Sequence, residues 1–286
     1  MRRFLFTFYR TFVHAESNSY KSLRLHLTHI DYKLVLVCLT TVLVLTCTYY
    51  FGDFRFLVSI LQDVGLDGLA LNLHRAMTIH PDADLYRAFY WASVVIFFYS
   101  ILPAICIKWI FKDKFSDYGT SFAGAFKYYR LYLGMLVVMV PLVIYFSATD
   151  SFLRMYPFYK VSPGDSLFPK FFIWEIFYFM QFVALEFFFR GFILHGTKHR
   201  FGFYAIFFMM VPYCMIHFGK PMPETIAAII AGVVLGYMSL MSRNIWMGVF
   251  VHCSVAFMMD ISALIRQGVF GGLGAHASIS IATTLQ

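Results

Sequence analysis

Charged residues are scarce in this sequence. Asp, Glu, Lys and Arg make up 13% of the 286 residues, and hydrophobic residues make up 60%. Soluble globular chains contain about 25% charged and 45–50% apolar residues. The shortage of charge therefore excludes an ordinary soluble domain. It predicts an all-α fold, a polytopic transmembrane helix bundle in a lipid bilayer.

Paired cysteines, internal repeats and the common hydrolase motifs are also missing. The five cysteines lie in separate apolar runs without CxxC spacing, so we interpret them as small core residues. No HExxH or GxSxG motif supports a zincin or a serine hydrolase. The lack of a fixed-period repeat disfavours a transporter built from repeated halves.

Seven apolar stretches are long enough to cross a bilayer, because one span needs about 20 residues. The predicted spans are roughly 34–51, 88–111, 131–148, 171–195, 202–218, 224–241 and 245–265. We divide the chain into a basic N-terminal segment (1–33), N-terminal helices and loops (34–170), a core (171–265) and a mobile tail (266–286).

The basic residues favour a cytoplasmic N-terminus. With seven spans, Lys and Arg number fourteen in the segments on the N-terminal side and eight in the segments on the other side. The positive-inside rule then predicts the N-terminus inside and the C-terminus outside. The basic, aromatic segment 1–33 is typical of an orientation signal that lies against anionic lipid. We therefore expect no nucleic-acid partner.

Two charged residues interrupt the fourth predicted span. Glu186 and Arg190 lie one helical turn apart in the run Leu185-Glu186-Phe187-Phe188-Phe189-Arg190-Gly191. A charged side chain at the bilayer centre costs roughly 2.5–3.5 kcal/mol even on the translocon-insertion scale. At i and i+4 the two side chains share one helix face and neutralise each other. The pair predicts either a functional site or a structural clamp between helices.

Two histidines in later spans, His217 and His252, lie at depths in the membrane from which they could contact the Glu186–Arg190 pair. Glu186 lies about 13 residues before the predicted turn between their spans and His217 about 15 residues after it, so both are roughly 20 Å from the cytoplasmic side. His252 lies roughly 12 Å deep. The competing interpretation of His217 is a cap at the end of its helix. We predict one polar cavity that contains Glu186, Arg190, His217 and His252.

Other polar residues in the spans are assigned structural roles. We expect Glu175 to line the outer end of the same cavity and Asp260 to orient a helix or a polar cavity. His195 and His199 are interpreted as surface residues at the cytoplasmic rim. Small residues four apart around Gly232 predict close helix packing rather than chemistry.

These side chains are the parts of a peptide hydrolase that lacks a nucleophilic side chain. A carboxylate with an imidazole supplies general base catalysis, and a second imidazole donates to the developing oxyanion. Arg190 would keep the carboxylate oriented and ionised. The alternative is a zinc site with Glu186, His217 and His252 as ligands. Arg190 disfavours it, because a cation beside a dication is unfavourable. We expect no cofactor.

The segment Glu186–Gly191, followed by Tyr213 to His217 and by His252, resembles the CPBP family of CAAX prenyl proteases and bacteriocin-processing or self-immunity enzymes. The resemblance covers about residues 171–262, and the family's FxxxH motif falls on Tyr213 and His217. It implies an intramembrane endopeptidase whose substrate is a membrane-associated peptide or protein. We expect the chain in a bacterial cell membrane. The implied catalytic residues are Glu186, Arg190, His217 and His252.

Two positions depart from the family pattern. The first of the family's two adjacent glutamates, thought to activate water, is Leu185 here. The asparagine or similar polar residue four positions after the last histidine is Ala256. Two interpretations follow: Glu186 has taken over as the base with His217, or the chain is a non-proteolytic relative with an immunity, chaperone or binding role.

Overall fold

The computed structural model describes residues 30–161 and 167–270. Every regular element in these two ranges is a helix, so the predicted all-α class is confirmed. Helices suit this composition because all their backbone groups are bonded within the segment, as hydrocarbon requires. The basic N-terminal segment (1–33) and the tail (266–286) lie largely outside the described residues.

The helices follow one another with short connections. Most are α-helices, η1 and η4 are π-helices, and the other η elements are 3₁₀ turns. In chain order they are α2 (Tyr32–Phe51), α3 (Phe54–Asp63), α4 (Asp67–Thr78), α5 (Ala83–Ile105), η1 (Cys106–Ile110), η2 (Phe115–Tyr118), η3 (Ala125–Tyr128), α6 (Tyr129–Phe146), α7 (Asp150–Met155), α8 (Lys170–Glu186), η4 (Phe187–His195), α9 (Gly196–Phe201), η5 (Gly202–Tyr204), α10 (Ala205–Met215), α11 (Met222–Ser242) and α12 (Trp246–Arg266).

Six helical runs in the described residues are long and apolar enough to cross a membrane. One of them, Lys170–Met215, is 46 residues long and contains two of the seven predicted spans. Gly202 interrupts this run with a φ of 54°, a conformation that favours glycine. After it, α10 packs back against η4. The run therefore supplies two antiparallel rods, and about seven spans fit the fold.

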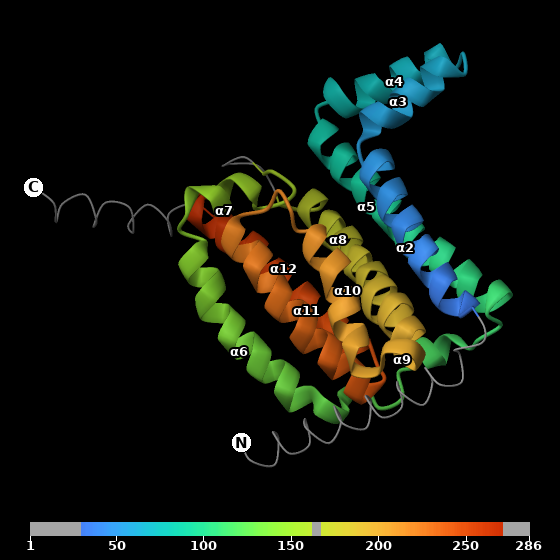
Figure 1. Ribbon diagram of the computed structural model, residues 1–286. Helices are drawn as coiled ribbons and strands as arrows, with labels where there is room; N and C mark the ends of the chain where they lie inside the picture. Colours follow the sequence, from blue (N-terminus) through green and yellow to red (C-terminus); the bar gives the residue numbers. More distant parts are fainter. Residues whose placement is uncertain (1–29, 162–166, 271–286) are drawn as a thin grey trace, which may run out of the picture. The chain divides into compact units, whose positions relative to one another are not determined.

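The long connection between the first two predicted spans forms a helical hairpin. Here α3 and α4 pack against each other (Figure 1). Asp53 begins α3 by accepting a hydrogen bond from the backbone N–H of Arg55. This N-terminal cap satisfies one of the backbone donors that the first helical turn leaves without a partner.

The chain divides into two compact units. Unit 1 comprises residues 1–48, 96–129 and 183–249, and unit 2 comprises residues 49–95, 130–182 and 250–286. In unit 1, η4, α10 and α11 pack against one another. In unit 2, aromatic rings such as Trp174 and Tyr178 stack at 5.0 Å within the core.

Glycines allow α11 to approach α10 closely in unit 1 (Figure 1). A Cβ atom on Gly232 would lie 2.9 Å from Cγ of Met210, and one on Gly236 would lie 3.0 Å from Cε of Met209. Both separations are shorter than ordinary carbon–carbon contacts. The predicted close packing around Gly232 is confirmed.

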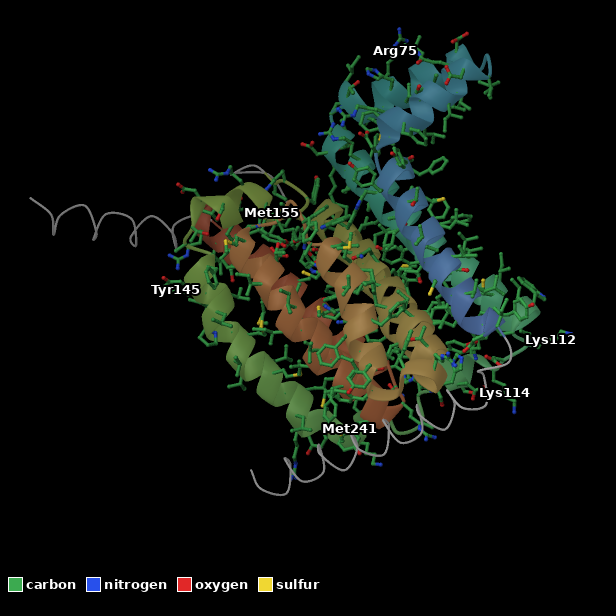
Figure 2. The ribbon with its side chains drawn as sticks, viewed as in Figure 1. Arg75, Lys112, Lys114, Tyr145, Met155 and Met241 are labelled. Carbon is green, nitrogen blue, oxygen red and sulfur yellow. The ribbon has the colours of Figure 1, made fainter. Side chains whose placement is uncertain are left out.

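Charged side chains gather on the segment of unit 1 that follows η1. Lys112 and Lys114 are exposed (Figure 2). Asp113 between them accepts hydrogen bonds from Nζ of Lys33 at 2.5 Å and from the hydroxyl of Tyr118 at 2.7 Å. Burial raises the pKa of Asp113, but these two bonds and the charge of Lys33 lower it by more. The net pKa of Asp113 is below its ordinary value.

Candidate active site

The predicted pair of charges lies where α8 becomes a π-helix in unit 1. Glu186 is the last residue of α8, and Arg190 lies within η4. Oε1 of Glu186 and Nη1 of Arg190 are 2.9 Å apart, so the predicted ion pair is confirmed. π-Helical turns are rare and frequently occur at functional sites. The backbone here departs from α-helix at the residues that carry the charge.

The ion pair is fully buried. The side chains of Glu186 and Arg190 are 1% and 0% exposed. Phe188, Phe189 and Phe192 of η4 are also completely buried. Removing each ion from water costs several kcal/mol, which the attraction to its partner offsets only while both ions are present. Each charge therefore depends on the other.

Gly248 of α12 lies directly against the Glu186 carboxylate. A Cβ atom at position 248 would be 2.5 Å from Oε2 and 3.0 Å from Cδ of Glu186. A side chain there would force either the carboxylate or α12 to move. The sequence interpretation missed this residue, although a single glycine inside an apolar helix often marks close backbone approach or packing.

Tyr213 and His217 connect the end of α10 to the ion pair. Cζ of Arg190 lies 4.0 Å from the ring centroid of Tyr213, a cation–π contact. Nδ1 of His217 is 2.9 Å from the carbonyl oxygen of Tyr213. Because a carbonyl only accepts, Nδ1 is the donor, and a neutral ring then carries its lone pair on Nε2. The same bond fits the competing interpretation, in which His217 caps the end of its helix.

His252 belongs to unit 2, where it is half-buried on α12. Its ring stacks on Phe182 with centroids 5.5 Å apart and planes 4° apart. The structure thus joins Glu186, Arg190 and His217 through neighbouring elements of unit 1. The meeting of His252 with these three stays a prediction.

The two positions that depart from the family pattern are filled by packing side chains. Leu185 is 6% exposed, and Ala256 is 4% exposed. Ala256 belongs to a buried cluster of unit 2 with apolar and aromatic members, namely Leu85, Ala88, Ala92, Trp174 and Tyr178. The polar groups that the family pattern places at these two positions are absent.

Comparison with protein families identifies the segment that contains these residues. Residues 167–258 match the family described as type II CAAX prenyl endopeptidase Rce1-like. This segment is similar to the Rce1-like family. The match confirms the resemblance inferred from the motifs, and it extends over Glu186, Arg190, His217 and His252. Comparisons with curated proteins and with solved structures gave no match.

The Rce1-like match supports a CAAX-type membrane endopeptidase in general terms. Together with the long apolar helices, it indicates an integral membrane protein. A protease of this family acts on a peptide or protein substrate in a membrane.

One prediction for the Rce1-like segment was wrong. His195, predicted at the surface, is 4% exposed, and its Nε2 lies 3.2 Å from Oγ of Ser239 on α11. It is buried because η4 and α11 pack against each other. His199 is half-buried, and its Nε2 lies 2.9 Å from Oδ2 of Asp31.

Glu175 and Asp260, which were assigned separate roles, interact with each other in unit 2. Their side chains are buried, with relative exposures of 3% and 0%. Oδ1 of Asp260 accepts the backbone N–H of Phe158 at 3.1 Å. The two carboxyl groups come from α8 and α12, two helices that are distant in the sequence. Spacing along the chain gave no signal of this contact.

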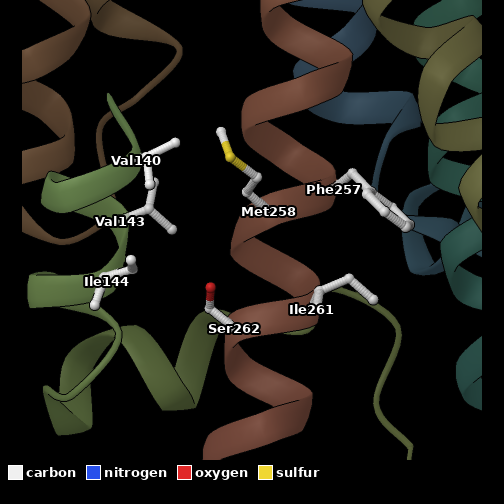
Figure 3. A pocket seen from close by; sticks show the side chains of 7 residues that line it. All are labelled: Val140, Val143, Ile144, Phe257, Met258, Ile261 and Ser262. Atoms are coloured by element: carbon white, nitrogen blue, oxygen red, sulfur yellow. The ribbon is translucent and has the colours of Figure 1, made fainter. Parts of the chain in front are cut away.

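An apolar groove of about 250 Å³ lies between α6 and α12 in unit 2 (Figure 3). Its lining contains one polar side chain, Ser262, and neither a carboxylate nor an imidazole. The lining residues are Val140, Val143, Ile144, Phe257, Met258, Ile261 and Ser262. The groove therefore supplies no acid or base for catalysis.

Proposed function

We propose that the chain hydrolyses a peptide bond near or within the bilayer, with a water molecule activated by Glu186 and His217. The observation that supports this proposal is the buried Glu186–Arg190 ion pair, linked through Tyr213 to His217 inside the Rce1-like segment. Such a set of polar groups is costly in hydrocarbon, which favours a functional reason for keeping it.

In the proposed reaction, the Glu186 carboxylate accepts one proton from a water molecule that Nε2 of His217 holds by a hydrogen bond, while the water oxygen attacks the peptide carbonyl carbon. His252 donates a hydrogen bond to the oxyanion. Arg190 keeps the Glu186 carboxylate oriented and ionised. The carbon–nitrogen bond then breaks, and the abstracted proton goes to the departing amine. Because Glu186 is 1% exposed, the reaction requires a conformation that admits water to it.

A non-proteolytic membrane relative is the second candidate function. The observation that favours it is the apolar packing of Leu185 and Ala256, where the family pattern has polar groups. Under this interpretation the ion pair clamps the helices, and the chain has a binding, chaperone or immunity role.

The zinc-dependent version of the reaction needs a set of protein ligands. In residues 30–161 and 167–270, no three His, Cys, Asp or Glu side chains are gathered so that they could hold a metal ion. We therefore write the reaction with the chain's own side chains. Full activity with a chelator present is the expected result, and loss of activity that added zinc restores would contradict it.

The test is cleavage of membrane-associated peptides, including a prenylated CAAX peptide, by the full chain in liposomes. Glu186→Gln and His217→Ala should each lower kcat by about 100-fold or more, the usual contribution of a general base. The matched control is Glu175→Gln, which alters a second buried carboxylate on the same helix and should keep activity. Full activity of Glu186→Gln would remove Glu186 from the chemistry.

Leu185→Glu separates the two candidate functions. It restores the pair of adjacent glutamates in the family pattern. If the wild type is inert on every peptide and Leu185→Glu cleaves, the chain is a non-proteolytic relative. If the wild type cleaves and depends on Glu186, the proposed hydrolysis holds.

We also propose that the N-terminus faces the cytoplasm, in a bacterial cell membrane. The support is the excess of Lys and Arg in the segments on the N-terminal side, including the exposed Lys112 and Lys114. In a cysteine-free background, Lys114→Cys should react with an impermeant maleimide only after the membrane is opened. Labelling in intact cells would contradict this topology.

A further inference from the structure

The ring of Tyr213 is held in place on several sides. Besides the guanidinium of Arg190 at 4.0 Å, it has Phe189 edge-on at 5.3 Å and the ring of His217 at 4.9 Å. A Cβ atom on Gly232 of α11 would come within 3.2 Å of its Cδ1. Tyr213 is 1% exposed. The ring therefore has little freedom to move.

This position lets one residue act on both proposed catalytic groups. Its ring contacts Arg190, which in turn holds Oε1 of Glu186 at 2.9 Å. Its carbonyl oxygen accepts from Nδ1 of His217 and thereby fixes the ring tautomer that carries its lone pair on Nε2. The side chain of Tyr213 thus fixes the position of the Glu186 carboxylate through Arg190, and its backbone carbonyl fixes the tautomer of the His217 imidazole.

We infer that Tyr213 is a positioning residue that fixes the geometry between the Glu186 carboxylate and the His217 imidazole through Arg190 and through its own carbonyl group. The inference rests on the proposed hydrolysis. The cation–π contact uses the ring face of Tyr213, so replacing the ring tests this contact directly.

The first experiment compares Tyr213→Phe with Tyr213→Leu. Tyr213→Phe keeps the ring and should retain kcat within about threefold of wild type. Tyr213→Leu removes the ring, releases Arg190 and should lower kcat at least tenfold with KM unchanged, because misplaced catalytic groups slow chemistry more than binding. Equal activity of the two variants, or a change in KM alone, would overturn the inference.

The second experiment moves the ring without changing Tyr213. Gly232→Ala places a methyl group 3.2 Å from Cδ1 of the ring and 2.9 Å from Cγ of Met210, and it should reproduce the loss of kcat. The matched control is Gly236→Ala, which disturbs the same packing of α11 on α10 through Met209 and Ile206 without touching Tyr213. Its kcat should stay near wild type. Equal losses in both variants would assign Tyr213 a packing role only.

The third experiment does not depend on activity. Tyr213→Leu is made in wild type and in Glu186→Gln/Arg190→Gln, where the pair has no charge. The unfolding equilibrium constant should rise by about 2- to 30-fold more in wild type, the range of a cation–π contact. Equal rises would overturn the inference. If wild type cleaves nothing but this difference is found, the hydrolysis fails while the contact stands.

Discussion

Among the described residues, each unit contains a buried pair of ionisable side chains. The two pairs differ in the charges that they combine and in whether they lie on one helical run or on two helices. Unit 1 holds a carboxylate and a guanidinium, Glu186 and Arg190, one turn apart on a single helical run. Unit 2 holds two carboxyl groups, Glu175 and Asp260, from two different helices. Opposite charges offset each other's desolvation, whereas two acids repel each other unless a proton or a donor intervenes.

The comparison indicates a catalytic role for the pair in unit 1 and a structural role for the pair in unit 2. The pair in unit 1 lies beside Tyr213, His217 and a glycine that makes room for the carboxylate. In unit 2, Oδ1 of Asp260 accepts a backbone N–H from Phe158, and the two acids come from α8 and α12. We expect loss of one charge to disable the first pair and to be tolerated in the second.

The largest effect is expected when Arg190 is replaced. Arg190→Gln leaves the Glu186 carboxylate buried without its counter-charge, and stability should fall by about 3–5 kcal/mol. Thermal unfolding of the purified chain measures the loss. The control is Arg55→Gln, which breaks the exposed pair of Arg55 with Asp53 and should leave the melting temperature unchanged. Equal behaviour of the two variants would mean that the pair in unit 1 is solvated.

A smaller but still large effect is expected at Gly248. Gly248→Ala forces a methyl group to within 2.5 Å of Oε2 of Glu186, so either the ion pair or α12 must move. Overpacking of this kind costs about 1–3 kcal/mol, and proteolytic activity should fall with it. Gly134→Ala on α6 is the control, since a Cβ atom there meets nothing within 4 Å. A neutral Gly248→Ala would show that the carboxylate is not confined by α12.

Glu175→Gln should have little effect or a favourable one. It removes one of two neighbouring acids while keeping the size of the side chain, so stability should be unchanged or rise by about 1 kcal/mol. The experiment is the same thermal unfolding, run beside Glu186→Gln, which we expect to be destabilising because it leaves Arg190 buried alone. If Glu175→Gln lowered stability as much as Arg190→Gln, the two buried pairs would not differ in the way that we propose.

The smallest expected change in stability concerns the Lys33–Asp113 ion pair. This pair is partly exposed, so it shows how little an ion pair contributes when it is not buried. The pKa of Asp113 is lowered on folding, so its contribution is present above its unfolded pKa of about 3.9 and is lost as pH falls through the lower folded value. Asp113→Asn should therefore be less stable than wild type by under about 1 kcal/mol near pH 7. The two melting temperatures should converge as the pH falls below the folded pKa of Asp113. A difference that persists at lower pH would assign the loss to packing.

Part of the active-site proposal could be predicted from the sequence because it is local. The i, i+4 spacing of Glu186 and Arg190 fixed their pairing, and the order of these residues with His217 and His252 indicated the Rce1-like segment. The turn at Gly202 could be placed because two apolar stretches met there, each long enough to span.

The sequence by itself determined the membrane-embedded helical class, the approximate spans and the ion pair, since composition and helical spacing act within one segment. Only the tertiary structure decided that Gly248 lies against Glu186, that Tyr213 lies under Arg190, and that Glu175 meets Asp260. The physical reason is that these helices are apolar on all sides. An amphipathic stripe reveals which face of a helix packs inward, and without one the rotation of each helix is set by side-chain packing alone.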